Sequence, residues 1–159
     1  MKKKDACGYI RDSTLAHFWK GNLFMMSGGA VSWLSRKQPV VALSTTETEY
    51  IALSLATQEA TWLKRLLSDI ATGPSKLVTI NEDNQGTIAV AKNPVSHART
   101  KHIDIKYHYV REALQNGTID LVYCPTENMI ADIFTKPLSR NRFEILRTEM
   151  GLVFLQETK

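Results

Sequence analysis

The chain has 159 residues, of which 43% are hydrophobic and 23% are charged. This length and composition suit one globular domain and exclude collagen-like, low-complexity and disordered chains. The formal net charge of +4 mildly favours a polyanionic partner. Only two cysteines occur, which excludes a small domain stapled by disulfides. Because neither a signal peptide nor a long apolar run is visible, we expect a soluble intracellular protein with no membrane partner.

Short apolar runs begin the regular structure. Asn22–Met26 and Ala30–Leu34 are separated by a Ser-Gly-Gly turn, a pattern typical of an antiparallel hairpin. Residues 6–10 allow a further short strand before them. Trp33, in the second run, and Trp62, further along the chain, are expected to be core aromatics.

A long helix follows, and then strands and helices alternate. Ser44 and Glu47 form a capping box, which predicts a helix that ends near Ile70, before Gly73-Pro74. The later predicted elements are the strand Leu77–Ile80, the helices Asn84–Lys92 and His102–Gln115, the strand Thr118–Tyr123, and the helices Glu127–Thr135 and Arg140–Met150. Strands separated by helices predict an α/β fold, with a mixed sheet that has parallel members and helical cover.

One face of the long helix is apolar as far as its first turns. The positions on this stripe recur every three or four residues and are Leu67, Leu63, Ala60, Ala56 and Leu53. The next position on the stripe is Glu49, and a carboxylate on a buried face is costly unless it is paired or binds a metal. A second capping box, Thr46 with Glu49, is the structural alternative. Glu47 falls on the polar face and is expected to face solvent.

Two aspartates lie in equally informative places. Asp83 follows a predicted strand and precedes a helix, where α/β folds position their sites, although a helix N-cap is the alternative. Glu82 beside it should point elsewhere, because strand side chains alternate. Asp132 lies among apolar neighbours in a predicted helix, and its alternative is one exposed turn of that helix. Three acids from distant segments suggest a shared site for Mg²⁺.

Four long blocks of sequence identify a known family. They are Val31–Trp33 with Ala42–Ala52, Glu82–Gln85, Ala98–Ile105, and Ala131–Leu138. Together these blocks resemble the ribonuclease H domain of copia-type LTR-retrotransposon Pol polyproteins, over residues 22–152. The resemblance divides one domain into an atypical first-strand region at 1–21, a ribonuclease H-like core at 22–138, and a C-terminal helix and tail at 139–159.

The resemblance implies a fold and an activity. The fold is a five-stranded mixed sheet, its first three strands antiparallel, with helices on both faces. The activity is hydrolysis of the RNA strand of an RNA–DNA hybrid with two Mg²⁺ or Mn²⁺ ions. The metal-binding and catalytic carboxylates would be Glu49, Asp83 and Asp132. The other implied partner is the reverse transcriptase domain of the same polyprotein, in a cytoplasmic virus-like particle.

The first strand departs from the family pattern. The family has Gly-Tyr followed closely by Asp-x-Asp-Trp, and the first of these aspartates binds both metals. Here alignment on Gly8-Tyr9 puts Arg11 at that place, and alignment on Trp19 puts Ala16 there. Asp12 is one residue away from the first alignment, and a one-residue slip turns a strand side chain to the opposite face. Asp12 therefore replaces the missing catalytic ligand only if the strand is bulged or re-registered.

Three functions follow from this departure. The first is an active hybrid nuclease, and the second is an inactive remnant that binds nucleic acid or packs on reverse transcriptase. The third, an integrase-type transposase, is disfavoured because Asp132 matches the ribonuclease H block and no zinc module precedes it. We expect weak or absent hydrolysis.

Polar and basic residues near the predicted site are candidates for contacting the hybrid. Asn84 and Gln85 are placed to bond the RNA 2′-hydroxyl, with helix capping by Asn84 as the alternative. A basic segment further along is suited to phosphate contacts, with a solvated helix face as the alternative for many of its charges. Its candidate residues are Arg99, Lys101, His102 and Lys106.

Overall fold

The computed structural model describes residues 7–12, 19–37, 45–70, 77–93 and 101–153. The strands are β1 (Cys7–Asp12), β2 (Trp19–Met26), β3 (Gly29–Lys37), β4 (Val78–Glu82) and β5 (Ile119–Tyr123). The α-helices are α1 (Thr45–Ile70), α2 (Gln85–Lys92), α3 (Lys101–Gln115) and α4 (Arg140–Glu149). Two 3-10 helices precede α4, η1 (Thr126–Asn128) and η2 (Ile130–Phe134).

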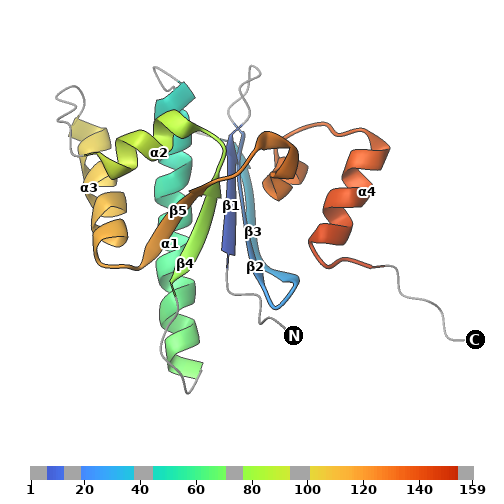
Figure 1. Ribbon diagram of the computed structural model, residues 1–159, viewed down its shortest axis with the longest axis horizontal. Helices are drawn as coiled ribbons and strands as arrows, with labels where there is room; N and C mark the ends of the chain where they lie inside the picture. The colour runs from blue at the N-terminus through green and yellow to red at the C-terminus, as the bar shows by residue number, and fades with distance from the viewer. Residues whose placement is uncertain (1–6, 13–18, 38–44, 71–76, 94–100, 154–159) are drawn as a thin grey trace, which may run out of the picture.

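The strands form one mixed sheet in the order β3-β2-β1-β4-β5. β2 is antiparallel to both β1 and β3, whereas β4 is parallel to both β1 and β5. The α/β class and the antiparallel hairpin at Met26–Gly29 are therefore as predicted. Since β1, β4 and β5 are parallel, their carboxyl ends lie at one edge of the sheet. In Figure 1 this is the upper edge, where α1 and α2 also begin.

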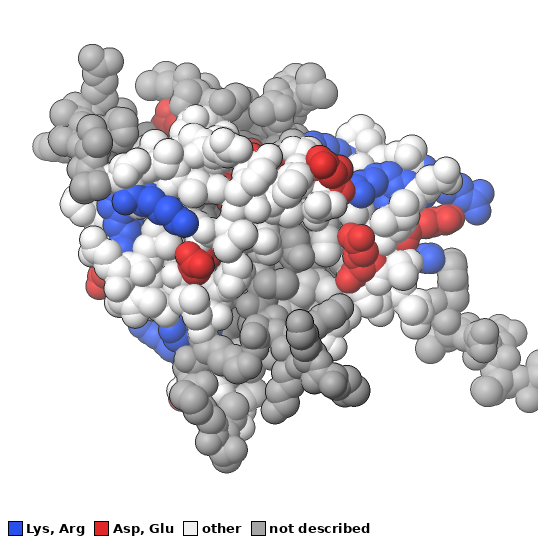
Figure 2. Space-filling view, viewed as in Figure 1, with Lys and Arg blue, Asp and Glu red and all other residues white. Residues whose placement is uncertain are grey.

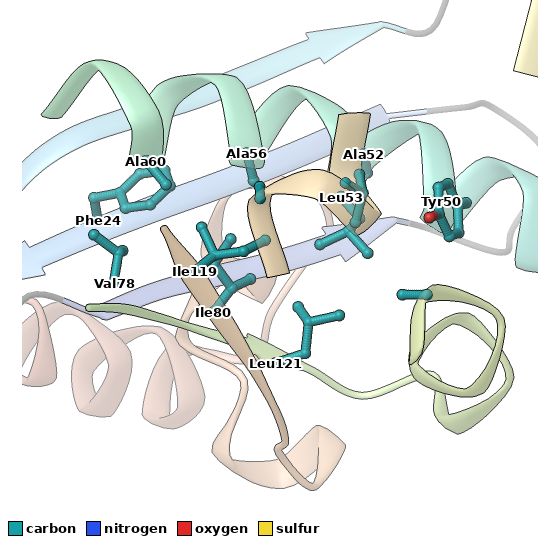
Figure 3. Packing of buried hydrophobic residues seen from close by; sticks show 13 residues of the cluster. Phe24, Tyr50, Ala52, Leu53, Ala56, Ala60, Val78, Ile80, Ile119 and Leu121 are labelled. Atoms are coloured by element: carbon teal, nitrogen blue, oxygen red, sulfur yellow. The ribbon is translucent and has the colours of Figure 1, made fainter. Parts of the chain in front are cut away.

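The larger core lies between α1 and one face of the sheet. Leu53, Ala56 and Ala60 of α1, which are stripe positions in the sequence, are each 0% exposed. They face Phe24, Ile80 and other strand residues in Figure 3, and α2 and α3 close the side of this cluster. A stripe with this spacing covers one side of a helix, so the whole helix can lie flat on the sheet.

The opposite face of the sheet carries a smaller core. Its members are Leu23, Met25, Cys124, Met129, Ile130, Ala131 and Met150. The α-helix predicted at Glu127–Thr135 is wrong, because two 3-10 helices stand there instead. Met129 separates them with an extended backbone (φ −79°, ψ 99°) and a side chain that is 0% exposed. The extended backbone at Met129 therefore ends the first 3-10 helix before the second begins, so no continuous α-helix forms.

The two tryptophans predicted for the core are exposed. Trp33 is 60% exposed on the edge strand β3, and Trp62 is 55% exposed on α1. A helix of 26 residues is about 39 Å long, whereas the nine residues of β3 extend about 30 Å. The last turns of α1 therefore reach past the sheet in Figure 1. Trp62 is exposed for another reason. It lies between Ala60, which is 0% exposed, and Leu63, which packs on the core, so it is on the face of α1 that points away from the stripe.

The helix α4 buries one of its residues, Leu146, and carries charged side chains of both signs. Arg140 pairs with Glu144 at 3.0 Å on the surface, and blue and red side chains mix over this helix in Figure 2. After α4 the chain meets the β2–β3 turn, where the Ala30 N–H donates to the Met150 carbonyl at 3.1 Å. None of the described helices is both long and apolar enough to cross a membrane.

Candidate functional site

The first carboxylate of the predicted set comes from α1. Glu49 is 3% exposed, beside the fully buried Tyr50. Glu47, two residues earlier, is less buried than Glu49 but is not fully exposed, so the expectation that it faces solvent holds only in part. Both carboxylates lie within the first two turns of α1, at the edge of the sheet where β1, β4 and β5 end.

The second carboxylate follows β4 directly. The Oδ2 atom of Asp83 accepts a hydrogen bond from the Thr126 hydroxyl at 2.9 Å. Glu82 before it is 0% exposed, and its Oε1 accepts the N–H of Asn84 at 2.9 Å. Asn84 is the N-cap of α2, since its side-chain oxygen accepts the N–H of Thr87 at 3.1 Å. The capping role that we had considered for Asp83 is thus performed by Asn84.

The third carboxylate lies in η2. Asp132 is 5% exposed, which excludes the alternative of an exposed helix turn. The Lys136 ammonium lies 3.2 Å from both of its carboxylate oxygens. A nearly buried carboxylate is costly without such a compensating charge. The ion pair therefore offsets part of the cost of placing Asp132 in this position.

The segment after β5 links Asp83 to Asp132. Its first residue, Cys124, is bonded through its N–H to the Glu82 carbonyl at 2.9 Å. Burial, and then the negative charges of Glu127 and Asp132, raise the pKa of the Cys124 thiol. The Cys124 N–H bond therefore ties the start of the segment that leads to Asp132 to the end of β4.

The start of α1 lies against the start of α2. A Cβ added to Gly86 would lie 3.5 Å from the Thr46 hydroxyl oxygen. Thr46 is one helical turn before Glu49, and Gly86 is three residues after Asp83. This proximity and the Thr126 hydrogen bond place the segments that carry Glu49 and Asp83 at one end of the sheet, and η2, which carries Asp132, follows Thr126 by a few residues (Figure 1).

The donor set fits a hard divalent cation. All three groups are carboxylates, the ligands that Mg²⁺ prefers. Within the described ranges, no three His, Cys, Asp or Glu side chains stand close enough to hold an ion among themselves. Mg²⁺ usually takes one or two protein carboxylates and completes its shell with waters and substrate phosphate. The arrangement therefore fits an ion shared with a substrate rather than one enclosed by protein.

The end of β1 reaches the same edge of the sheet. β1 pairs in parallel with β4 as far as Tyr9 opposite Asn81. Counting on from that pair, Arg11 is level with Asp83 and Asp12 is one residue beyond it. The ladder between β1 and β2 is regular from Cys7 to Asp12, without the bulge that Asp12 would need to take over the missing position. The side chains of Arg11 and Asp12 lie outside the described residues.

The candidate nucleic-acid residues are placed unevenly. Asn84 uses its amide oxygen to cap α2. Gln85 is the first residue of that helix and is exposed. Lys106 is partly buried on α3. Arg99, and the side chains of Lys101 and His102, lie outside the part of the chain that the structure describes.

Three side chains that support the site were missed by the sequence reasoning. Lys136 was detectable, because it follows Asp132 by four residues, the spacing of a helical ion pair. Thr126 gave no signal, since it reaches a partner 43 residues away. Glu82 was expected to point away from Asp83, and it does lie on the buried face of β4. Its bond to the Asn84 backbone was not foreseen.

Comparison with known sequences identifies a set of relatives, although no family model matches the chain. The chain is 42% identical over 132 residues to the retrovirus-related Pol polyprotein from transposon TNT 1-94 of Nicotiana tabacum. It is 35% identical over 132 residues to that from transposon RE1 of Arabidopsis thaliana. Each match covers 83% of this chain but only 10% and 9% of the relative. The chain thus spans about a tenth of the polyproteins that it matches.

Solved structures give the fold. The crystal structure of LC11-RNase H1 in complex with RNA/DNA hybrid matches with a TM-score of 0.57 at 14% identity, over 82% of this chain and 93% of that one. The N-terminal RNase H domain of a Mycobacterium tuberculosis protein matches with a TM-score of 0.57 at 11% identity, over 90% and 96%. By sequence the chain is a homologue of a segment of the retrovirus-related Pol polyproteins of transposons, and by fold it is a ribonuclease H-like domain.

Proposed function

We propose that the chain is the ribonuclease H domain of a retrotransposon polyprotein, and that its hydrolysis of the RNA strand in RNA–DNA hybrids is impaired. The observation that carries this proposal is the gathering of the segments bearing Glu49, Asp83 and Asp132 at the carboxyl edge of the sheet. One structural relative was solved with an RNA/DNA hybrid, which supports the same ligand here. The polyprotein relatives support a reverse transcriptase domain as the neighbouring partner.

The three carboxylates would hold Mg²⁺ or Mn²⁺ at this edge together with waters and substrate phosphate. Two such ions, when bound, activate a water and neutralise charge on the scissile phosphate. Lys136 would balance the charge of Asp132 until a cation arrives, since its ammonium stands 3.2 Å from both oxygens. Glu82 keeps the peptide bond after Asp83 in place by accepting the Asn84 N–H.

The impairment follows from β1. The family aspartate that would bind both ions is missing under either alignment of this strand. In the alignment on Gly8-Tyr9, Arg11 takes its place, with its backbone level with Asp83, and the regular ladder with β2 supports an Asp12 that is out of register. Without that aspartate, Glu49, Asp83 and Asp132 would share at most one ion with waters and substrate phosphate, and one ion would not stabilise the attacking and leaving oxygens together. A binding remnant of the same fold is the second candidate, and the same regular ladder favours it.

The test is a labelled RNA–DNA hybrid incubated with Mg²⁺ and the protein. We expect little cleavage by the parent chain, with retardation of the hybrid on a gel that weakens as salt rises. Arg11→Asp should raise the cleavage rate at least about ten-fold, because it returns a carboxylate to the level of Asp83. Asp83→Asn should abolish the gain, and Asp69→Asn, at the exposed far end of α1, is the matched control.

The results distinguish an active nuclease from a binding remnant. Brisk cleavage by the parent that Asp12→Asn abolishes would show that Asp12 has taken over the missing role. Retardation without cleavage, even with Arg11→Asp, would favour the binding remnant. Absence of both cleavage and retardation would contradict the proposed function.

A further inference from the structure

We infer that Thr126 is a positioning residue for Asp83, holding that carboxylate in the orientation in which it binds the divalent cation. The inference rests on the proposed function and names a residue that the family motifs do not include. Its basis is the hydrogen bond from the Thr126 hydroxyl to Asp83 Oδ2 at 2.9 Å, between residues 43 apart in the sequence. The two residues meet where β4 and β5 end side by side.

The backbone on both sides of Thr126 is fixed. The N–H of Cys124 donates to the Glu82 carbonyl at 2.9 Å, which continues the pairing of β5 with β4 by one residue. Pro125 follows with φ −55°, the value to which its ring restricts it. The N–H of Asn128 then bonds the Pro125 carbonyl at 2.8 Å, and that of Met129 bonds the Thr126 carbonyl at 3.2 Å. The hydroxyl is therefore presented by a short, bonded turn.

Asp83 is held from two directions. On its backbone side, the buried Glu82 accepts the N–H of Asn84, the residue that starts α2. On its side-chain side, Thr126 fixes one carboxylate oxygen and with it the plane of the group. A carboxylate has about four lone-pair sites, so the hydroxyl bond does not by itself prevent Asp83 from binding a cation.

The bond belongs to the exposed rim of the molecule rather than to its core. Water can replace an exposed hydrogen bond at little net cost to folding, so this bond contributes little to stability. Its effect is on orientation, because hydrogen bonds to metal-binding carboxylates set their geometry and tune metal affinity. Valine keeps the shape of threonine but removes the hydroxyl, whereas serine keeps the hydroxyl.

The experiment is a titration of the apo protein with Mn²⁺, followed by calorimetry and by water-proton relaxation. We expect Thr126→Val to weaken Mn²⁺ binding about ten-fold, the lower end of the range for such bonds. Thr126→Ser should stay within about two-fold of the parent, since it restores the donor. Thr148→Val is the matched control, because Thr148 is an exposed threonine on α4 whose hydroxyl also makes a 2.9 Å bond, to the Glu144 carbonyl. Thermal unfolding should be alike for all four proteins.

The outcomes separate the inference from the proposed function. If the parent binds Mn²⁺ and Asp83→Asn weakens that binding while Thr126→Val does not, only the role of Thr126 is overturned. Serine and valine variants with equal losses would also overturn it, because the hydroxyl would then be irrelevant. If the parent binds no Mn²⁺ at millimolar concentration, the proposed function and this inference both fail.

Discussion

The two faces of the sheet are covered in different ways. On one face, α1 lies flat on the strands and α2 and α3 close the side, giving a core that includes Leu53, Ile80 and Leu121. On the other face, two 3-10 helices and the end of α4 cover a smaller cluster around Met129. Glu49 comes from the first covering and Asp132 from the second. We call the covering by α1, α2 and α3 the thick layer, and the covering by η1, η2 and the end of α4 the thin layer. The carboxylate site therefore depends on both layers.

The largest expected effect is in the thick layer. Leu53→Ala removes a side chain of α1 that is 0% exposed, in a core closed by α2, α3 and the sheet, so the cavity cannot collapse. We expect a loss of about 3–5 kcal/mol in the free energy of unfolding, measured in urea. Leu66→Ala, at a position that is 38% exposed, should cost less than about 1 kcal/mol. Similar losses at both positions would mean that the end of α1 is covered after all.

A smaller loss is expected in the thin layer. Met129 is also 0% exposed, but its neighbours lie in short 3-10 helices that can shift into the space left by Met129→Ala. We expect Met129→Ala to lower the free energy of unfolding by about 2 kcal/mol, the lower end of the range for a buried methionine. The same urea titration measures it. If Met129→Ala costs more than Leu53→Ala, the thin layer is the more rigid one and the comparison is reversed.

Cys124 reports how tightly the thin layer is closed. Burial, followed by the charges of Glu127 and Asp132, raises the pKa of its thiol, so less thiolate is present at pH 8 than in an ordinary cysteine. In a Cys7→Ser background, alkylation by iodoacetamide should be slow at pH 8 and should still be accelerating above pH about 9. Glu127→Gln removes one of the charges and should speed the reaction at fixed pH. A rate equal to that of the urea-unfolded chain would show that this layer opens readily.

The smallest effect is expected on the face of α1 that points away from the sheet. Trp62→Gln alters a side chain that is 55% exposed, so the free energy of unfolding should change by no more than about 0.5 kcal/mol. Thermal unfolding suffices as the measurement. A loss of several kcal/mol would mean that Trp62 is part of the core, as the sequence first suggested.

The thick layer was the more predictable one. Apolar residues at three- and four-residue spacing need a continuous partner, so the stripe through Leu53 identified both α1 and the unusual position of Glu49. The core prediction for Trp62 failed because it rested on the aromatic side chain alone, whereas Trp62 lies on the face of α1 opposite this stripe. Near Asp132 the apolar run was too short to distinguish an α-helix from 3-10 turns. The hydrogen bond between Thr126 and Asp83 could not be predicted from the sequence, since only the pairing of β4 with β5 brings the two residues together.

The contact between the end of α4 and the β2–β3 turn has a consequence for local opening of the protein. The Ala30 amide lies at the start of a strand but donates to Met150, outside the sheet. Its exchange with deuterated solvent therefore reports detachment of α4, while amides deeper in β2 and β3 report opening of the sheet. Gly151 (φ +81°) fits against the same turn so closely that a Cβ there would stand 2.5 Å from the Gly28 carbonyl oxygen. A side chain at position 151 would push the end of α4 away from the β2–β3 turn. The Ala30 amide would then lose its protection against hydrogen exchange long before the strands separate.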